Sequence, residues 1–180
     1  MLDRVYKEEL GWLQSAEEGL KDRYHGNSQY ICAFDGFTPV GALRVVHDSA
    51  AGLPIEQFTD LRSLILGKAV ELQRFAVVPE WRVRRVDDAP FGVGTALYRA
   101  ALRLCAAENV ETMVADVFLN TATTPIPFLR SMGFEQQPIL FQDTELAHEG
   151  ESSVMLARVR DILKLRQAGS RPLDRYLTEA

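Results

Sequence analysis

The first clear pattern in the chain is a pair of strand-like segments near its N-terminus. Over Ser28–Phe34, successive side chains would point to opposite faces of an extended chain, with apolar residues on both faces. Asp35-Gly36 follows as a turn signal, and Val40–Val46 is a second apolar run. The two segments predict an antiparallel hairpin.

A strand, a helix and another strand form the most regular part of the pattern. Glu71–Val78 is a mainly apolar run that ends at Pro79, because proline cannot donate to a sheet ladder. Thr95–Glu108 carries an apolar stripe at helical spacing, and Val110–Phe118 is again strand-like. This order predicts two parallel strands joined by a right-handed crossover.

The other segments complete the picture more loosely. In chain order they predict a helix over 3–21, a short helix within Ile55–Leu66, a helix over Pro125–Met132, strands over Phe134–Phe141 and Ser153–Val159, a helix over Arg160–Gln167, and a tail, Ala168–Ala180, draped over the surface. Together the elements predict a single α/β domain over residues 1–180. Its sheet is mixed, mostly antiparallel and flanked by helices on both faces.

Composition narrows the class of protein. The 180 residues are 47% hydrophobic and 25% charged, which is typical of a globular domain. The net charge of −5 disfavours a nucleic-acid partner, which needs a basic face. Neither the two cysteines nor the three histidines have the spacing of a disulfide framework or a metal site. No apolar run is long enough to span a bilayer and no signal peptide is evident, so we expect a cytoplasmic protein with no membrane partner.

A glycine pair at the start of the best helix is the strongest candidate for ligand binding. Free amide groups and the helix dipole at such a position suit a phosphate, and the cradle would be Gly92, Val93, Gly94 and Thr95. The other interpretation is an ordinary turn. Just before it stand three cations that would pair either with phosphates or with an acidic partner protein: Arg82, Arg84 and Arg85. A solvated basic turn balanced by Asp87 and Asp88 is the alternative.

These features resemble the cofactor-binding core of the GNAT superfamily of acyltransferases. The likeness continues through Asn120 and through Phe128–Phe134, which reads FLRSMGF. It implies a GNAT-type fold with the phosphopantetheine arm of an acyl thioester held between the central strands, at Phe75, Ala76, Val77, Asn120 and Phe128. It also implies that backbone amides near Ala76 and Val77 polarise the thioester carbonyl. The alternative role of Asn120 is to stabilise the turn in which it lies.

A narrower resemblance links the N-terminal half to acyl-homoserine-lactone synthases and N-acyl amino acid synthases. It rests on the segments YKEELGW (6–12), VGALRVV (40–46), GLPIE (52–56) and ELQRFAV (71–77). These enzymes often take their acyl group from an acyl carrier protein. The chain departs from the synthase pattern at Leu2 and at the pair Asp22 and His25, which disfavours lactone synthesis. It departs from the usual GNAT pattern at Ala89, where that pattern has glutamine or arginine, and at Leu129, where many GNAT enzymes have a tyrosine.

Acyl transfer from a thioester to an amine requires a base but no covalent enzyme intermediate. Glu71 is the candidate base, acting directly or through a water, because burial in an apolar strand raises a carboxylate pKa. The other interpretation is a structural ion pair with Arg44 or Arg74, the other two candidates for the catalytic group. Glu71 and Arg74 point to opposite faces of a regular strand, and only a bulge would bring both to one cleft.

The sequence therefore predicts an N-acyltransferase that moves an acyl group from acyl carrier protein or acyl-CoA to a small amine such as an amino acid. The thioester is a co-substrate, and no tightly bound cofactor or metal is expected. The alternatives are an ordinary acetyl-CoA-dependent N-acetyltransferase and a non-catalytic module that binds acyl thioesters.

Overall fold

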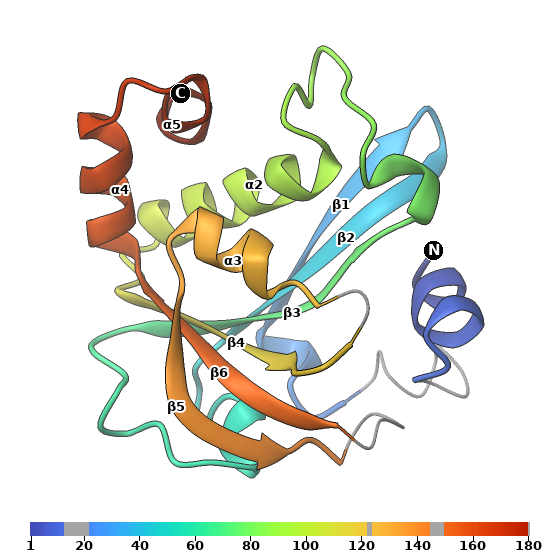
Figure 1. The fold of residues 1–180 in the computed structure, drawn as a ribbon. Coiled ribbons are helices and arrows are strands. Elements are labelled where there is room, and N and C mark those ends of the chain that lie inside the picture. Colours follow the sequence, from blue (N-terminus) through green and yellow to red (C-terminus); the bar gives the residue numbers. More distant parts are fainter. Residues whose placement is uncertain (13–21, 122–123, 145–149, 180) are drawn as a thin grey trace.

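The computed structural model describes residues 1–12, 22–121, 124–144 and 150–179 (Figure 1). Its centre is a six-stranded sheet in the order β1-β2-β3-β4-β6-β5, and only the β3–β4 pair is parallel. The strands are β1 (Ser28–Asp35), β2 (Thr38–His47), β3 (Ala69–Val77), β4 (Thr112–Phe118), β5 (Glu135–Gln142) and β6 (Glu151–Arg158). The predicted mixed, mostly antiparallel sheet is confirmed, and each predicted strand lies within two residues of the observed one at either end.

The helices agree with the sequence pattern less uniformly. The α-helices are α2 (Val93–Ala107), α3 (Ile126–Met132), α4 (Val159–Ala168) and α5 (Pro172–Thr178). The first three confirm the prediction. The fourth, α5, corrects the prediction for the C-terminal tail. The tail contains a helix that begins at Pro172, since proline is well tolerated in a first helical turn.

Four shorter helical elements lie in the described residues, and two of them replace helices that the sequence predicts. The N-terminal segment forms the π-helix η1 (Asp3–Glu9), and the rest of the predicted 3–21 helix, from residue 13 on, lies outside the described residues. The expected helix within Ile55–Leu66 is only a 3₁₀ turn, η3 (Pro54–Gln57). Further 3₁₀ turns are η2 (His25–Asn27) and η4 (Pro79–Trp81).

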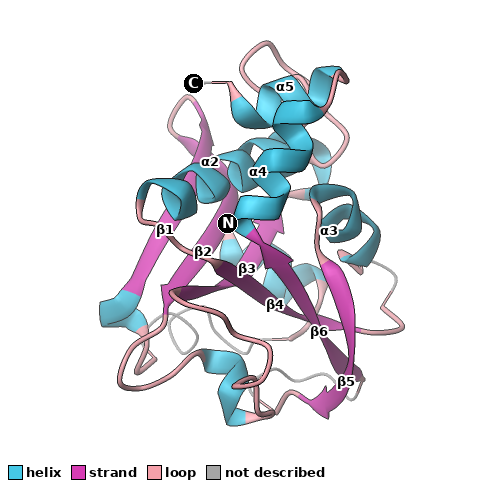
Figure 2. Ribbon diagram, turned by 90° about the vertical axis from the view of Figure 1, so that its left-hand side faces the viewer, coloured by secondary structure: helices cyan, strands magenta, loops and turns pink. Residues whose placement is uncertain are grey.

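The α-helices gather on one face of the sheet (Figures 1 and 2). Side chains from all four of them join the main hydrophobic cluster, examples being Leu97 of α2, Leu129 of α3 and Ile162 of α4. Helix α2 lies close to β2 because Gly41 has no side chain there, and a Cβ at Gly41 would stand 2.8 Å from Val93 Cγ1.

The opposite face has a smaller apolar cluster of its own. Within the described residues it is covered by the 48–68 connection, whose Leu53, Ile55 and Leu61 pack on Val114 and Val154 of the sheet. In the part of the chain that the structure describes, a loop with one 3₁₀ turn covers this second face, where the sequence predicts a helix. In the described part of the chain, no helix is long and apolar enough to cross a membrane.

The central parallel strands separate soon after they meet. The β3–β4 register covers only Ala69–Glu71 opposite Thr112–Val114. Beyond that point β3 follows β2 through a bulge between the Arg44–Gln73 and Ala42–Ala76 pairs, where Arg74 has a φ of 50°. Meanwhile β4 stays paired with β6 as far as Phe118. A gap therefore opens between β3 and β4, and the candidate site occupies it.

The C-terminal helices are joined by a buried ion pair. Arg166 Nη1 lies 2.6 Å from Asp174 Oδ1, and the two side chains are 3% and 2% exposed. Arg171 Nε lies 2.8 Å from Asp174 Oδ2. Hydrogen bonds from Arg171 and then Arg166 lower the pKa of Asp174 to about 2.

Low pH should weaken the ion pair between Asp174 and Arg166 over a defined pH range. The folded pKa of Asp174 lies below the unfolded value of about 3.9, so its contribution is complete above that value and is lost as the pH falls through about 2. We expect the melting temperature of the wild type to drop between about pH 4 and pH 2 and that of Asp174→Asn, which starts lower at pH 7, to drop less. Equal drops, measured by circular dichroism, would contradict this assignment.

Candidate functional site

A cavity of about 390 Å³ fills the gap between the separating halves of β3 and β4. Its walls come from η1, β2, β3, α2, β4, the segment after β4 and α3. Most lining side chains are apolar or aromatic. The charged ones among the described lining residues are Arg74, Arg82, Asp116 and Asp143.

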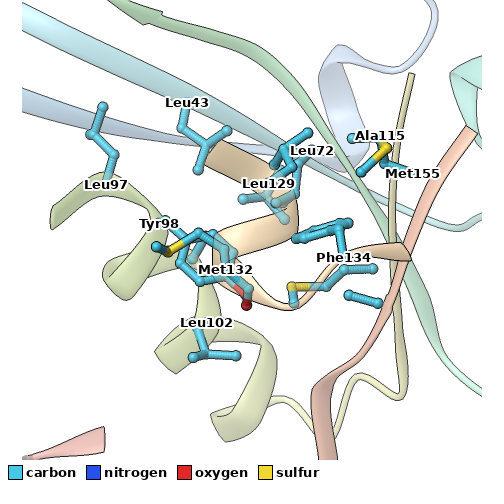
Figure 3. Packing of buried hydrophobic residues seen from close by; sticks show 14 of the residues in the cluster. Leu43, Leu72, Leu97, Tyr98, Leu102, Ala115, Leu129, Met132, Phe134 and Met155 are labelled. Atoms are coloured by element: carbon cyan, nitrogen blue, oxygen red, sulfur yellow. The ribbon is translucent and has the colours of Figure 1, made fainter. Parts of the chain in front are cut away.

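The end of the cavity beneath the helices is apolar. Leu43 and Leu72 reach it from the sheet, Ala115 from β4, and Leu129 and Tyr98 from the helices above (Figure 3). Tyr98 contributes its ring, because its hydroxyl donates to the Met132 carbonyl at 3.2 Å. This end can hold a hydrocarbon chain out of water.

The other end of the cavity is polar. Gln73 and Arg74 line it from β3 and Asp116 from β4, and Asp143 lies just beyond β5. Sequence reasoning missed Asp116 and Asp143. A signal for Asp116 was present, since it interrupts the apolar strand Thr112–Phe118 in the same way that Glu71 interrupts its own strand.

A second cavity of about 300 Å³ lies at the start of α2. It is lined by Phe91, Gly92, Gly94, Thr95 and Phe128, and it shares four lining residues with the first cavity: Phe75, Val77, Arg82 and Pro125. A ligand could therefore extend from the helix start into the gap between the strands.

The start of α2 has the geometry of an anion site. Gly92 is the N-cap with a φ of 90°, a conformation that favours glycine, and no side chain caps the helix. The Ala96 amide donates to the Gly92 carbonyl, so the amides of the three preceding residues belong to the unpaired first turn. Val93 offers only its backbone here, because its side chain is buried in the core.

The three predicted cations are separated by the fold. Arg82 lines both cavities, donates to the Val77 carbonyl at 3.0 Å and forms two bonds of 2.6 Å with Glu9. Arg84 is exposed and stacks 4.1 Å from the Trp81 ring centroid. Arg85 is also exposed, and neither residue lines a cavity.

The two candidate backbone donors on β3 differ in direction. The Val78 amide donates to Val40 on β2 at 3.0 Å. Because N–H groups alternate along a strand, the Ala76 amide also points to β2, whereas the Val77 amide points to the opposite edge, toward the gap. Of the two amides, that of Val77 is therefore placed to meet a ligand carbonyl.

Arg44 and Arg74 meet at a shared carboxylate. Arg44 is fully buried and donates from Nη2 to Asp22 Oδ1 at 2.6 Å and from Nε to Ser28 Oγ at 2.9 Å. Arg74 Nη2 lies 3.3 Å from Asp22 Oδ2. Although burial alone would raise the pKa of Asp22, the bonds from Arg44 hold it below its usual value. Of the two arginines, only Arg74 also lines the cavity.

Glu71 lies behind the cavity wall rather than in it. Its carboxylate is fully buried and accepts hydrogen bonds of 2.8 Å from the Ile55 amide and from Gln73 Nε2. Gln73, which does line the cavity, lies between Glu71 and the open space. The structure thus brings Glu71 within one side chain of the cavity.

Asn120 stands at the exposed turn after β4 with a φ of 59° and lines neither cavity.

Comparison with known proteins identifies the family to which this chain belongs. Residues 1–138 match the family described as N-acyl amino acid synthase FeeM. The chain belongs to this family. It is therefore a GNAT-fold acyltransferase, as the sequence predicts. No curated protein sequence is similar enough to match the chain.

Solved structures agree with the family. FeeM from uncultured soil microbes has a TM-score of 0.67 at 15% identity, with 91% of this chain and 84% of that chain covered. Escherichia coli ElaA has a TM-score of 0.58 at 16% identity, with 87% and 84% covered. The CoA-dependent acyl-homoserine lactone synthase BjaI, solved with MTA, has a TM-score of 0.58 at 16% identity, with 91% and 75% covered. At these identities the likeness shows a shared fold.

Proposed function

We propose that the protein transfers an acyl group from a phosphopantetheine thioester to the α-amine of an amino acid by direct attack of the amine on the thioester carbonyl. The observation that carries the proposal is the continuity of the two cavities through Phe75, Val77, Arg82 and Pro125. The shared residues link the start of α2 to the apolar end of the first cavity along the part of β3 that faces the gap.

Each part of the donor molecule would contact lining residues of suitable chemistry. The phosphate group would accept hydrogen bonds from the first-turn amides of α2. The pantetheine arm would follow β3 past the rings of Phe75 and Phe128, which pack together with centroids 5.3 Å apart, and the Val77 amide would donate to the thioester carbonyl. The acyl chain would fill the apolar end at Leu43, Leu72 and Leu129. An acetyl group would leave most of that end empty, which favours longer chains over an acetyltransferase role.

Residues behind the wall would shape the site without touching substrate. Glu71 holds Gln73 through a bond of 2.8 Å, and Arg44 holds Asp22, which in turn pairs with Arg74. In this proposal Glu71 and Arg44 are positioning residues, and Arg74 is the member of the sequence-predicted catalytic group that meets substrate.

The donor could come as acyl-CoA or on an acyl carrier protein, since both present the same arm. Exposed Arg84 and Arg85 favour the carrier, because the surfaces of acidic proteins are attracted to such cations. They also lie near the arm's entrance, since a Cβ at Gly92 would be 3.7 Å from the Arg84 carbonyl.

Intact-mass detection of products tests the proposal. The protein is incubated with acyl carrier protein and CoA donors bearing the same long acyl chain, and with a pool of amino acids. We expect a new amide from the carrier-bound donor, and we expect Arg84→Glu with Arg85→Glu to slow that reaction while sparing any slower reaction with CoA. An amide from CoA alone would reassign the donor. No amide from either donor would overturn the proposal in favour of a binding module.

A further inference from the structure

The polar end of the cavity carries charges of both signs in an otherwise uncharged lining. Arg82 is held by Glu9 on both oxygens, which leaves Arg74 as the cation of this end. A guanidinium has five N–H donors, and the ion pair with Asp22 uses only one edge of Arg74. Arg74 can therefore bind a second carboxylate that enters from the cavity.

Asp116 and Asp143 are the two carboxylates among the described lining residues, and Asp116 is the one that lies on a strand bordering the gap. It projects from β4 across the gap from the β3 bulge that carries Arg74. Both groups act on the buried Tyr6 phenol: burial and then the Asp116 charge raise the pKa of Tyr6, and Arg74 opposes them. Tyr6, Arg74 and Asp116 all line the cavity, and they come from three separate elements.

An aromatic wall stands next to these charges. Phe118 is two residues beyond Asp116 and so shares its face of β4. The ring of Trp12 lies 4.9 Å from that of Phe118 and 5.9 Å from that of Tyr6, centroid to centroid. All three rings line the cavity.

We propose that Arg74 and Asp116 form the acceptor site and that it is built for a zwitterion: Arg74 binds the α-carboxylate of a free amino acid, and Asp116 binds its α-ammonium group and takes the proton that must leave before attack. The acceptor side chain would lie against Trp12 and Phe118, which favours apolar or aromatic amino acids. This inference rests on the proposed function and adds the residues that select the acceptor.

The amino acid nitrogen loses two protons during the proposed reaction. The ammonium group gives a proton to the Asp116 carboxylate, and the neutral amine attacks the thioester carbon. A C–N bond forms, the C–S bond breaks, and the thiolate leaves. Nitrogen loses a second proton, which the thiolate gains, and Asp116 returns its proton to solvent. The products are an N-acyl amino acid and a free thiol.

Arg74→Gln tests carboxylate recognition by comparing two acceptors. These are an amino acid and its primary carboxamide, which keeps the amine but lacks the negative charge. We expect the wild type to favour the acid and the variant to lose roughly 10–100-fold of that preference, measured as the ratio of kcat/KM values. A general structural defect would lower both rates and keep the ratio. An unchanged ratio would overturn the role of Arg74.

Asp116→Asn tests the proton acceptor, with Glu71→Gln beside it and Asp161→Asn, on the exposed face of α4, as the matched control. We expect Asp116→Asn to lose roughly 100-fold or more of kcat at pH 7 and to recover about tenfold per pH unit as free amine accumulates. Donor binding and the melting temperature should stay near wild type. Glu71→Gln should lose about tenfold without that steep recovery.

The outcomes separate this inference from the function itself. If the wild type makes amides but Asp116→Asn matches the control, Asp116 is not the proton acceptor. If Glu71→Gln instead shows the steep pH recovery, Glu71 has that role. If the wild type makes no amide from any donor, the proposed function fails, whatever these variants do.

Discussion

Ala115→Leu is expected to transfer short acyl groups at close to the wild-type rate and long ones about 50-fold more slowly. Ala115 is 4% exposed and faces the apolar end of the cavity from β4. Leucine adds three carbon atoms there and so removes room for roughly three CH₂ groups of the acyl chain. At about 0.8 kcal/mol for each CH₂, the loss is about 2.4 kcal/mol.

The measurement is kcat/KM against acyl chain length for a series of otherwise identical donors. Ala157→Leu is the matched control, because Ala157 is a buried alanine of β6 in the same hydrophobic cluster but does not line the cavity. It should destabilise the fold without changing the chain-length profile. If Ala115→Leu slows all chain lengths equally, the acyl chain does not lie in this part of the protein.

Arg44→Met is expected to lower the free energy of unfolding by about 3 kcal/mol. Methionine keeps the apolar length of the side chain but removes the guanidinium that binds Asp22 and Ser28. Breaking a buried pair from one side costs about 3–5 kcal/mol, and the lower end applies because Asp22 keeps Arg74 and is 22% exposed.

Urea unfolding followed by tryptophan fluorescence measures this change. Arg62→Met serves as the control, because Arg62 pairs with Asp60 on the exposed surface and its loss should leave the unfolding midpoint unchanged. An unfolding midpoint of Arg44→Met equal to that of the control would show that the Asp22 network contributes nothing to stability. Because the pKa of Asp22 is held low, the contribution of this network is present at neutral pH and is lost only as the pH falls below the ordinary aspartate range.

The strands and α2 were predictable because their apolar periods are strong and their ends carry glycine, proline or turn residues. The glycine-rich start of α2 was also predictable, since Gly92 and Gly94 lie between a strand and a strong helix, and its role as a phosphate site stays a prediction. The C-terminal helix α5 was missed because it is only seven residues long and begins at Pro172, a residue that is favoured in a first helical turn.

The arrangement of the site depended on features that no local pattern encodes. Arg74 lies in the bulge with a positive φ. Glycine or asparagine at this position would have indicated such a conformation, but arginine does not. Glu71 was expected at the reacting centre because it is a carboxylate in an apolar strand, but its bond to Ile55 turns it toward the face covered by the 48–68 connection. Asp116 follows the same sequence logic but lines the cavity, because Glu71 is still paired with Val114 whereas β3 and β4 have separated by the position of Asp116.

The central claim is that the gap between β3 and β4 holds the acyl thioester. Its most direct test is photochemical labelling with an acyl-pantetheine thioester that carries a diazirine at the end of its chain, followed by mass spectrometry of the labelled peptides. We expect adducts on the peptides that contain Leu43, Leu72 or Leu129, and we expect excess unlabelled thioester to reduce them. Adducts confined to the opposite apolar cluster, at Leu53 or Leu61, or spread over the surface without competition, would contradict it.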